Sequence, residues 1–321
     1  MPVPRVLVIG NPEAPNLQLL NDLPQPTDLH IGSDAEFLAR EAPLAEVVLY
    51  ASFDGALFHR TWPMLRQARW VHSLAAGVEG ILTPEFVASP VPLTNAAGVF
   101  AEALGEYAIT AVLYFAKNMP LMTGNQRAHR WEWLTVEMVR GKTLGVIGYG
   151  GIGRESARLA AALGMRVIAL RRRPQTGRDE IAERIYASNQ LHELLAASDY
   201  VLMAMPSTPE TRHMMGAAEF RAMQESAVLI NLGRGSAVDE AALVDALREK
   251  RIRGAALDVC ETEPLPADSP LYTLDNILLS AHSADRTQDW LERATRMFME
   301  NYGRFVRGEP LLNVVDKKAG Y

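Results

Sequence analysis

The glycine-rich run Gly148–Gly153 (GYGGIG) constrains the fold of this chain most strongly, because it joins an apolar segment to a helical one. Residues 143–147 have the apolar character of a buried strand, and residues 154–163 contain few helix breakers. A strand, a GxGxxG loop and a helix in this order form the phosphate-binding turn of dinucleotide-binding domains. The sequence therefore predicts a Rossmann-type domain around this loop.

Each glycine of the loop has an expected role. Gly148 permits the tight turn, Gly150 lets the backbone approach a pyrophosphate, and Gly153 allows the helix to pack closely on the strand. Gly151 and Ile152 begin the helix, whose N-terminal amides are expected to face the phosphate charge. We assign all five residues to cofactor binding.

The loop lies near the middle of the 321 residues, so sequence for a whole domain precedes it. Short apolar runs before and after the loop alternate with helical patterns, as in parallel sheets covered by helices on both faces. Five strands are expected before the loop, at 6–9, 29–31, 47–50, 70–73 and 93–95. Six are expected from the loop onward, at 143–147, 167–170, 200–205, 228–232, 255–259 and 277–280. The prediction is an α/β chain of two doubly wound parallel-sheet domains.

Composition excludes several classes of function. The formal net charge of −6 gives no overall attraction to nucleic acid or to an anionic membrane. No apolar run reaches the length of about 20 residues that a membrane-spanning helix needs. The single cysteine, Cys260, excludes an internal disulfide and a multi-cysteine metal site, and we expect no metal. These features favour a cytoplasmic protein with a small-molecule ligand.

Four segments after the glycine loop resemble the D-isomer-specific 2-hydroxyacid dehydrogenase family in order and approximate spacing. They are Met205–Thr211 (MPSTPET), Ile230–Gly235 (INLGRG), Ala256–Leu265 (ALDVCETEPL) and Asn276–Ser283 (NILLSAHS). The N-terminal half is similar more loosely, through Ser73–Glu79 (SLAAGVE) and Thr94–Gly98 (TNAAG).

The resemblance implies a flavodoxin-like substrate domain built from residues 1–97 and 284–321, with a Rossmann cofactor domain at 98–283 inserted into it. It also implies an active site in the cleft between the two domains. The implied cofactor contacts beyond the glycine loop are Met205, Pro206, Leu232, Gly233 and Asp258.

Reduction of a 2-keto acid by hydride needs a cation for the carboxylate, an acid for the forming alkoxide, and a partner that tunes the acid. Arg234 is the candidate cation, because a guanidinium binds a carboxylate through two parallel hydrogen bonds. Its neighbours Gly233 and Gly235 suggest close backbone approach to a ligand. His282 follows an expected strand, and its imidazole can transfer a proton near neutrality.

The family's catalytic glutamate immediately precedes a proline, which selects Glu263 over Glu261 as the partner that orients His282 and raises its pKa. Glu261 is then expected to be solvated. For the substrate carboxylate, the amides of Ala76, Gly77 and Val78 form a candidate nest. A surface turn is the alternative interpretation of that loop.

Two further side chains lie near the expected substrate loop. Asn95 is a candidate at the cleft, although a buried polar turn residue would explain it almost as well. His72 is a candidate supporting residue next to the loop.

Arg171 departs from the family pattern. Many members place a carboxylate at this strand end to bind the ribose 2′-hydroxyl. Arg171 and Arg172, together with Arg173, could instead surround a 2′-phosphate. We therefore expect NADP(H) to be preferred, with NAD(H) possible.

Asp285 is a second departure, because many relatives have small residues after the histidine. It could tune His282, contact substrate or cap a helix beginning near Arg286, and capping is the commonest use of such an aspartate. Trp131 and Trp133 lie where the family often forms a dimer arm, so a homodimer is expected, although packing within the chain is the alternative.

The leading hypothesis is an NADP(H)-linked reductase of glyoxylate, hydroxypyruvate or a larger 2-keto acid. Formate or phosphite oxidation is an alternative within the same fold. A dinucleotide-sensing corepressor, which binds protein partners, is the alternative outside the enzymes.

Overall fold

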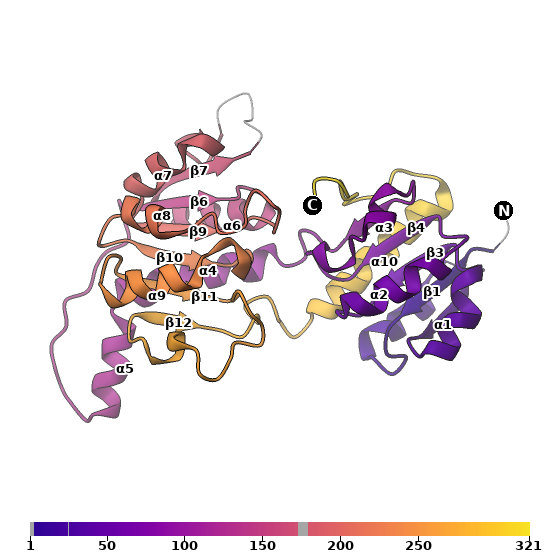
Figure 1. Cartoon of the computed structure of the whole chain (residues 1–321), viewed down its shortest axis with the longest axis horizontal. Helices are drawn as coiled ribbons and strands as arrows, with labels where there is room; N and C mark the ends of the chain where they lie inside the picture. Colours follow the sequence, from indigo (N-terminus) through magenta and orange to yellow (C-terminus); the bar gives the residue numbers. More distant parts are fainter. Residues whose placement is uncertain (1–2, 25, 173–178) are drawn as a thin grey trace. The chain divides into compact units, whose positions relative to one another are not determined.

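The computed structural model describes residues 3–24, 26–172 and 179–321, and the chain divides into two compact units (Figure 1). The first unit comprises Met1–Phe100 and Thr287–Tyr321, and the second comprises Ala101–Arg286. The sequence placed these changes after residues 97 and 283. Each unit contains its own parallel sheet.

The sheet of the first unit has the order β2-β1-β3-β4-β5, and every neighbouring pair is parallel. Its strands are β1 (Arg5–Ile9), β2 (Asp28–Gly32), β3 (Val47–Tyr50), β4 (Trp70–Ser73) and β5 (Leu93–Asn95). Its α-helices are α1 (Ala35–Glu41), α2 (Gly55–Thr61), α3 (Pro84–Ala88) and α10 (Trp290–Arg307). Its 3-10 helices are η1 (Pro15–Asp22), η2 (Ala42–Leu44), η3 (Trp62–Met64) and η4 (Glu79–Ile81). This strand order is that of flavodoxin-like folds.

The C-terminal helix α10 returns to the first unit and completes its core, so the yellow helix lies among indigo elements in Figure 1. The Trp70 ring stacks on Phe298 and Phe305 of α10, with centroid separations of 5.3 and 5.5 Å. Asn16 Nδ2 donates to Thr295 Oγ1 at 2.9 Å, both buried. Both ends of the chain therefore build one hydrophobic core.

The sheet of the second unit has the order β12-β11-β10-β9-β6-β7-β8 and is entirely parallel. Its strands are β6 (Thr143–Ile147), β7 (Arg166–Arg171), β8 (Arg184–Ala187), β9 (Tyr200–Met203), β10 (Val228–Asn231), β11 (Gly254–Leu257) and β12 (Ile277–Leu279). Counted from β6, this is the Rossmann order 3-2-1-4-5-6 with one strand added. The predicted fold class is confirmed.

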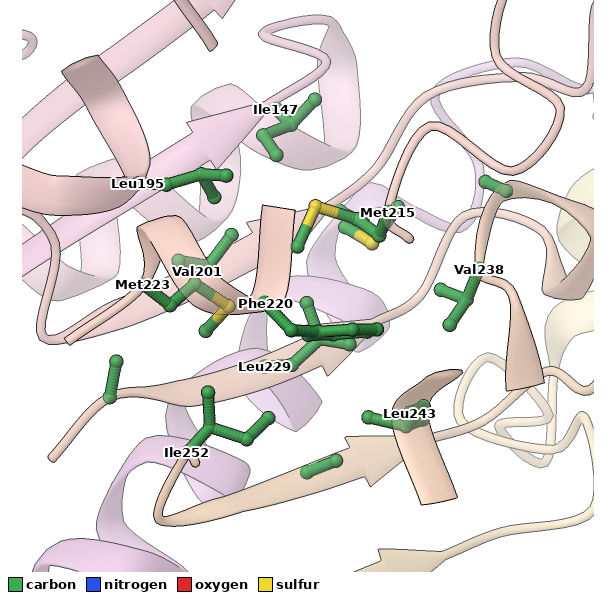
Figure 2. Close-up of a cluster of buried hydrophobic side chains, with 14 of the residues drawn as sticks. Ile147, Leu195, Val201, Met215, Phe220, Met223, Leu229, Val238, Leu243 and Ile252 are labelled. Atoms are coloured by element: carbon green, nitrogen blue, oxygen red, sulfur yellow. The ribbon is translucent and has the colours of Figure 1, made fainter. Parts of the chain in front are cut away.

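Helices cover the second sheet. The α-helices are α4 (Ala101–Ala116), α5 (Met119–Arg127), α6 (Gly151–Ala162), α7 (Leu191–Ala197), α8 (Ala217–Ala222) and α9 (Glu240–Arg248). The 3-10 helices are η5 (Ser188–Gln190), η6 (Gly235–Ala237) and η7 (Pro270–Thr273). Figure 2 shows how Phe220 of α8 lies in the core with Val201 of β9 and Leu229 of β10, all three at most 1% exposed.

Two elements were missed by the sequence analysis. Strand β8 pairs with β7 at the sheet edge, and only part of its short Arg-Ile-Tyr-Ala sequence is apolar. Helix α5 begins at Met119, with Pro120 in its first turn. Proline suits the first turn of a helix, but it also commonly follows the end of one, so Pro120 does not by itself reveal α5.

No helix in the described ranges is both long and apolar enough to cross a membrane.

Candidate active site

The glycine loop leaves its backbone open at the position expected to face a pyrophosphate. Gly148 has φ +93°, and a Cβ there would lie 2.7 Å from Ala204 C. A Cβ on Gly153 would lie 2.4 Å from Gly148 O, whereas one on Gly150 would meet no atom within 4 Å. Helix α6 begins at Gly151 directly after this open position. The loop therefore places open backbone at the N-terminus of a helix, an arrangement that suits an anionic group.

A buried carboxylate that the sequence analysis missed anchors this loop. Tyr149 Oη donates to Asp179 Oδ1 at 2.8 Å, and Arg154 Nη1 donates to Asp179 Oδ2 at 2.9 Å. The backbone amides of Ile181 and Ala182 each donate to Asp179 Oδ1 at 2.9 Å. Burial alone would raise the pKa of Asp179, but the Ala182 and Ile181 amides, Tyr149 and Arg154 lower it to about 2.

The basic residues expected near the ribose lie at the neighbouring strand end. Arg171 is the last residue of β7, and Gly148 N donates to Leu170 O at 3.3 Å, so β7 ends beside the glycine loop. A hydrogen bond from Thr208 and, more weakly, the charge of Arg172 lower the pKa of Glu210. Arg173 lies outside the described residues.

Asn231, another residue missed by the sequence analysis, fixes the backbone around Arg234. It is fully buried at the end of β10. Its Oδ1 accepts from Gly233 N at 3.1 Å, and its Nδ2 donates to Arg234 O at 3.0 Å. Arg234 Nη1 donates to Gly233 O at 2.8 Å. The guanidinium thus projects from a loop held by a buried amide.

The two glycines beside Arg234 allow close backbone packing within the second unit. A Cβ on Gly235 would lie 1.9 Å from Cys260 O, and one on Gly233 would lie 2.8 Å from Met205 O. The loop of Arg234 therefore presses against the backbone that leads to Glu263. Only glycine permits so close an approach.

His282 and Glu263 form the hydrogen-bonded pair that the resemblance implies. His282 Nδ1 and Glu263 Oε2 lie 2.7 Å apart, and Glu263 Oε1 accepts from Cys260 N at 3.0 Å. The side chains are 45% and 38% exposed, respectively. With the Glu263 carboxylate as acceptor, Nδ1 carries the hydrogen and Nε2 remains for proton exchange.

Glu261 is exposed, as expected, and its carboxylate also has partners on the surface. Its carboxylate lies 2.6 Å from His213 Nε2 and 3.7 Å from Arg212 Nη2. Its backbone amide donates to Glu240. Glu261 therefore ties the segment before Glu263 to two other parts of the second unit.

The remaining predicted residues of the second unit lie at strand ends. Leu232 N donates to Met203 O at 3.0 Å, Met205 is buried, and Pro206 O accepts from Thr211 Oγ1 at 2.9 Å. Asp258 follows β11 and is buried.

Asp285 does not cap a helix, because α10 begins at Trp290 and Asp289 precedes it. Burial raises the pKa of the Asp285 carboxyl, against the opposing effect of the nearby His282 charge. Asp285 therefore lies within electrostatic reach of His282.

In the first unit, Asn95 supports the expected carboxylate loop. Asn95 Nδ2 donates to Ala76 O at 2.6 Å, and its Oδ1 accepts from Ala97 N at 3.2 Å. Gly77 and Val78 continue the loop, with Val78 buried directly before η4. The structure therefore brings the four predicted residues of this unit together.

His72 is a core residue, not a supporting residue of a site. It is fully buried, with Nδ1 2.7 Å from Thr94 Oγ1, and its ring packs near Phe298. Burial lowers the pKa of His72 to about 3, so the imidazole stays neutral near pH 7.

Cys260 is a free cysteine, and burial raises the pKa of its thiol to about 11. Within the described ranges, no group of three or more His, Cys, Asp or Glu side chains is placed to hold a metal ion.

Comparison with known proteins identifies the family. Residues 109–284 match the model of the D-isomer specific 2-hydroxyacid dehydrogenase NAD binding domain, and this match spans more than half of the chain. The chain belongs to the D-isomer-specific 2-hydroxyacid dehydrogenase family. It is therefore an oxidoreductase of the 2-hydroxyacid dehydrogenase type.

Members of this family resemble the chain over most of its length. A glyoxylate reductase of Aeropyrum pernix is 35% identical over 290 residues, covering 87% of this chain and 84% of the relative. A family structure from Xanthobacter autotrophicus, in complex with NADPH, has a TM-score of 0.88 at 28% identity, covering 99% and 100% of the two chains. An NADPH-dependent glyoxylate/hydroxypyruvate reductase of Sinorhizobium meliloti has a TM-score of 0.85 at 26% identity, covering 99% and 100%.

Proposed function

We propose that this enzyme reduces a small 2-keto acid such as glyoxylate or hydroxypyruvate with NADP(H). The observation that carries the proposal is the 2.7 Å contact between His282 Nδ1 and Glu263 Oε2. This contact leaves Nε2 of His282 available for proton transfer. It also fixes the orientation of the ring, because the Glu263 carboxylate accepts a hydrogen bond from the Cys260 amide.

His282 is the acid of the proposed reaction. The nicotinamide supplies the hydride to the keto carbon when the dinucleotide is bound. The keto oxygen takes up the Nε2 proton of His282 as its carbonyl bond becomes a hydroxyl. Glu263 accepts a hydrogen bond from Nδ1 throughout, which stabilises the imidazolium before transfer and keeps the ring oriented afterward. In the reverse direction, the neutral imidazole accepts the hydroxyl proton.

Arg234 binds the substrate carboxylate in this proposal. Its guanidinium can present two parallel N–H donors, and a bidentate contact orients the keto carbon as well as neutralising charge. The hydrogen bond from Asn231 to the Arg234 backbone supports this role. A guanidinium can orient the substrate only if the backbone that carries it is fixed. We also assign carboxylate binding to the amides of Ala76, Gly77 and Val78, with Asn95 bracing Ala76.

The preference for NADP(H) rests on Arg171 and Arg172. Arg171 ends the strand next to the glycine loop, where a carboxylate would accept a hydrogen bond from the ribose 2′-hydroxyl. Guanidinium groups suit a 2′-phosphate instead. Gly148 to Gly153, Met205, Pro206, Leu232, Gly233 and Asp258 complete the proposed cofactor contacts. The NADPH complex of the Xanthobacter relative supports this choice.

A panel of 2-keto acids tests the function. Glyoxylate, hydroxypyruvate and larger 2-keto acids are offered with NADPH and with NADH, and nicotinamide absorbance is followed. We expect turnover of at least one acid, with a higher kcat/KM for NADPH. Binding of NADPH without turnover of any acid would favour a dinucleotide-sensing protein, and a clear preference for NADH would contradict the assignment of Arg171.

We also infer a homodimer formed through the segment that follows α5. Trp131 and Trp133 are each 97% exposed, and Met138 is 71% exposed. Asn125 Nδ2 donates to Glu132 Oε2 at 3.1 Å, which holds part of the segment against α5. Two neighbouring tryptophans in water favour burial against a second copy, because aromatic residues are enriched in interface cores.

A further inference from the structure

A chain of three side chains links helix α4 to the loop that carries His282. Ser280 Oγ donates to Asp258 Oδ1 at 2.6 Å, and Tyr107 Oη lies 2.6 Å from Ser280 Oγ. A carboxylate only accepts hydrogen bonds, so the Ser280 hydrogen is committed to Asp258. The hydrogen between Tyr107 and Ser280 therefore comes from the tyrosine. Burial raises the pKa of Tyr107, which keeps its phenol protonated for this role.

Asp258 accepts several hydrogen bonds from the loop that carries His282. Its Oδ1 also accepts from the amides of Ser283 at 2.9 Å and Ala284 at 3.1 Å. Its backbone oxygen accepts from His282 N at 2.8 Å. The loop thus meets one buried residue both before and after the histidine.

The backbone of His282 needs such support. Its φ is +49°, in the left-handed region that is unfavourable for residues with a Cβ. A residue stays in this conformation only when its surroundings hold it there. The bonds to Asp258 on both sides of His282 provide that hold, and Ser280 also contacts Tyr107 of α4.

Tyr107 projects from a firmly seated helix. Helix α4 packs on α6, and a Cβ on Gly105 would lie 2.9 Å from Glu155 Cγ of α6. The backbone that carries Tyr107 is therefore held in place two residues after this close contact.

We propose that Tyr107 is a positioning residue for His282, acting through Ser280 and Asp258 to fix the loop of residues 280–284. The inference rests on the proposed acid role of His282. It assigns Tyr107 no contact with substrate or cofactor, only the task of holding Ser280 so that the Asp258 hydrogen bond keeps its direction.

Single-hydroxyl variants test the proposal by kinetics. Tyr107→Phe keeps the ring but leaves Ser280 Oγ without its donor, and we expect kcat to fall about tenfold. KM for the keto acid and Kd for NADPH should change less than about twofold, because Tyr107 is assigned no contact with either ligand and Asp258 keeps its hydrogen bonds from the Ser283 and Ala284 amides. Ser280→Ala should behave alike, and Ser280→Thr, which keeps the hydroxyl, should restore most of kcat.

Tyr114→Phe is the matched control. Tyr114 is on the same helix, its ring packs edge-on against Phe115 at 5.2 Å, and we expect kcat to stay at the wild-type value. Wild-type kcat in Tyr107→Phe would overturn the proposal. A parallel loss of kcat, substrate affinity and NADPH affinity would also overturn it, because Tyr107 would then support the fold generally.

A measurement without turnover separates this proposal from the proposed function. The ring signals of His282 are followed by NMR in protein with labelled histidine and assigned through His282→Ala. We expect Tyr107→Phe to shift or broaden the His282 signal and to leave the His213 signal unchanged. An unchanged His282 signal overturns the positioning role. Absence of turnover in the wild type would instead overturn the proposed function and leave the NMR result to decide on Tyr107.

Discussion

Gly235 is the residue at which the loops of Arg234 and Glu263 meet. Because glycine has no Cβ, the backbone of Gly235 can lie close to Cys260 O; a Cβ there would be only 1.9 Å from that oxygen. Gly235→Ala forces the two loops apart, and we expect a loss of about 3 kcal/mol in the free energy of unfolding. Urea denaturation followed by tryptophan fluorescence measures it.

Gly124→Ala is the control for this prediction. Gly124 lies inside α5, and a Cβ there meets no atom within 4 Å. The substitution should stabilise the chain by about 0.5–1 kcal/mol, because alanine favours a helix. Equal changes in the free energy of unfolding for the two substitutions would show that the close backbone approach at Gly235 does not determine the effect of Gly235→Ala.

His282 and Glu263 could be found from the sequence because both belong to short motifs that follow strands. The structure places the two side chains in contact. Asn231, Asp179 and Tyr107 could not be found in this way. Each acts through hydrogen bonds to partners that only the fold brings near, and Tyr107 and Ser280 are 173 positions apart. A tyrosine with helical spacing is read from sequence as part of an apolar face.

The strands were the most predictable elements, because a parallel strand buried on both faces consists almost wholly of apolar residues. All six strands predicted for the second unit are present, but β9, β10, β11 and β12 end one or two residues earlier than predicted. Strand β8 was missed because it lies at the edge of the sheet, where Arg184 is exposed and the apolar run is short. The short, partly polar sequence of β8 lacks the pattern on which the prediction depends.

Asp179 makes the stability of the cofactor-binding unit depend on pH. The pKa of this carboxyl is about 2 in the folded chain and 3.8 as its ordinary value, and the side chain is 5% exposed. A lowered carboxyl pKa stabilises the fold fully above the unfolded value and loses this effect as pH falls toward the folded value. The stabilisation of about 2 kcal/mol is therefore present above about pH 4 to 5 and decreases between about pH 4 and 2.

Asp179→Asn tests this pH dependence. We expect the variant to be less stable than the wild type at pH 7, with the difference diminishing below pH 4, in urea denaturation at a series of pH values. The exposed Asp268→Asn serves as control and should follow the wild type. A difference for Asp179→Asn that stays constant from pH 7 to pH 3 would contradict the account.

At the scale of the whole molecule, the chain forms two parallel sheets, each with a strand order that is common in α/β proteins. The orders β2-β1-β3-β4-β5 and β12-β11-β10-β9-β6-β7-β8 consist of parallel strands joined by crossover connections, and the chain returns to the first unit through α10. Strand patterns alone predicted two α/β units. The insertion of one unit into the other came from the family resemblance, because α10 carries no signal for which sheet it covers.

The proposed dimer predicts a concentration-dependent mass. Light scattering after gel filtration should give twice the chain mass for the wild type. Trp131→Ser with Trp133→Ser should yield monomers, because the exposed rings would no longer bury apolar area against a second copy. Phe53→Ser, at a 62% exposed residue of the first unit, is the control and should remain dimeric. A monomeric wild type would refute the inference.

The central claim is that His282 supplies the proton while the glycine loop binds the dinucleotide independently of it. Reduction of glyoxylate by NADPH is measured in the wild type and in His282→Ala, together with Kd for NADPH from quenching of tryptophan fluorescence. The account predicts a fall in kcat of at least about 100-fold, the usual effect of removing a positioned acid, with Kd changed less than about twofold. Undiminished turnover in His282→Ala would contradict it.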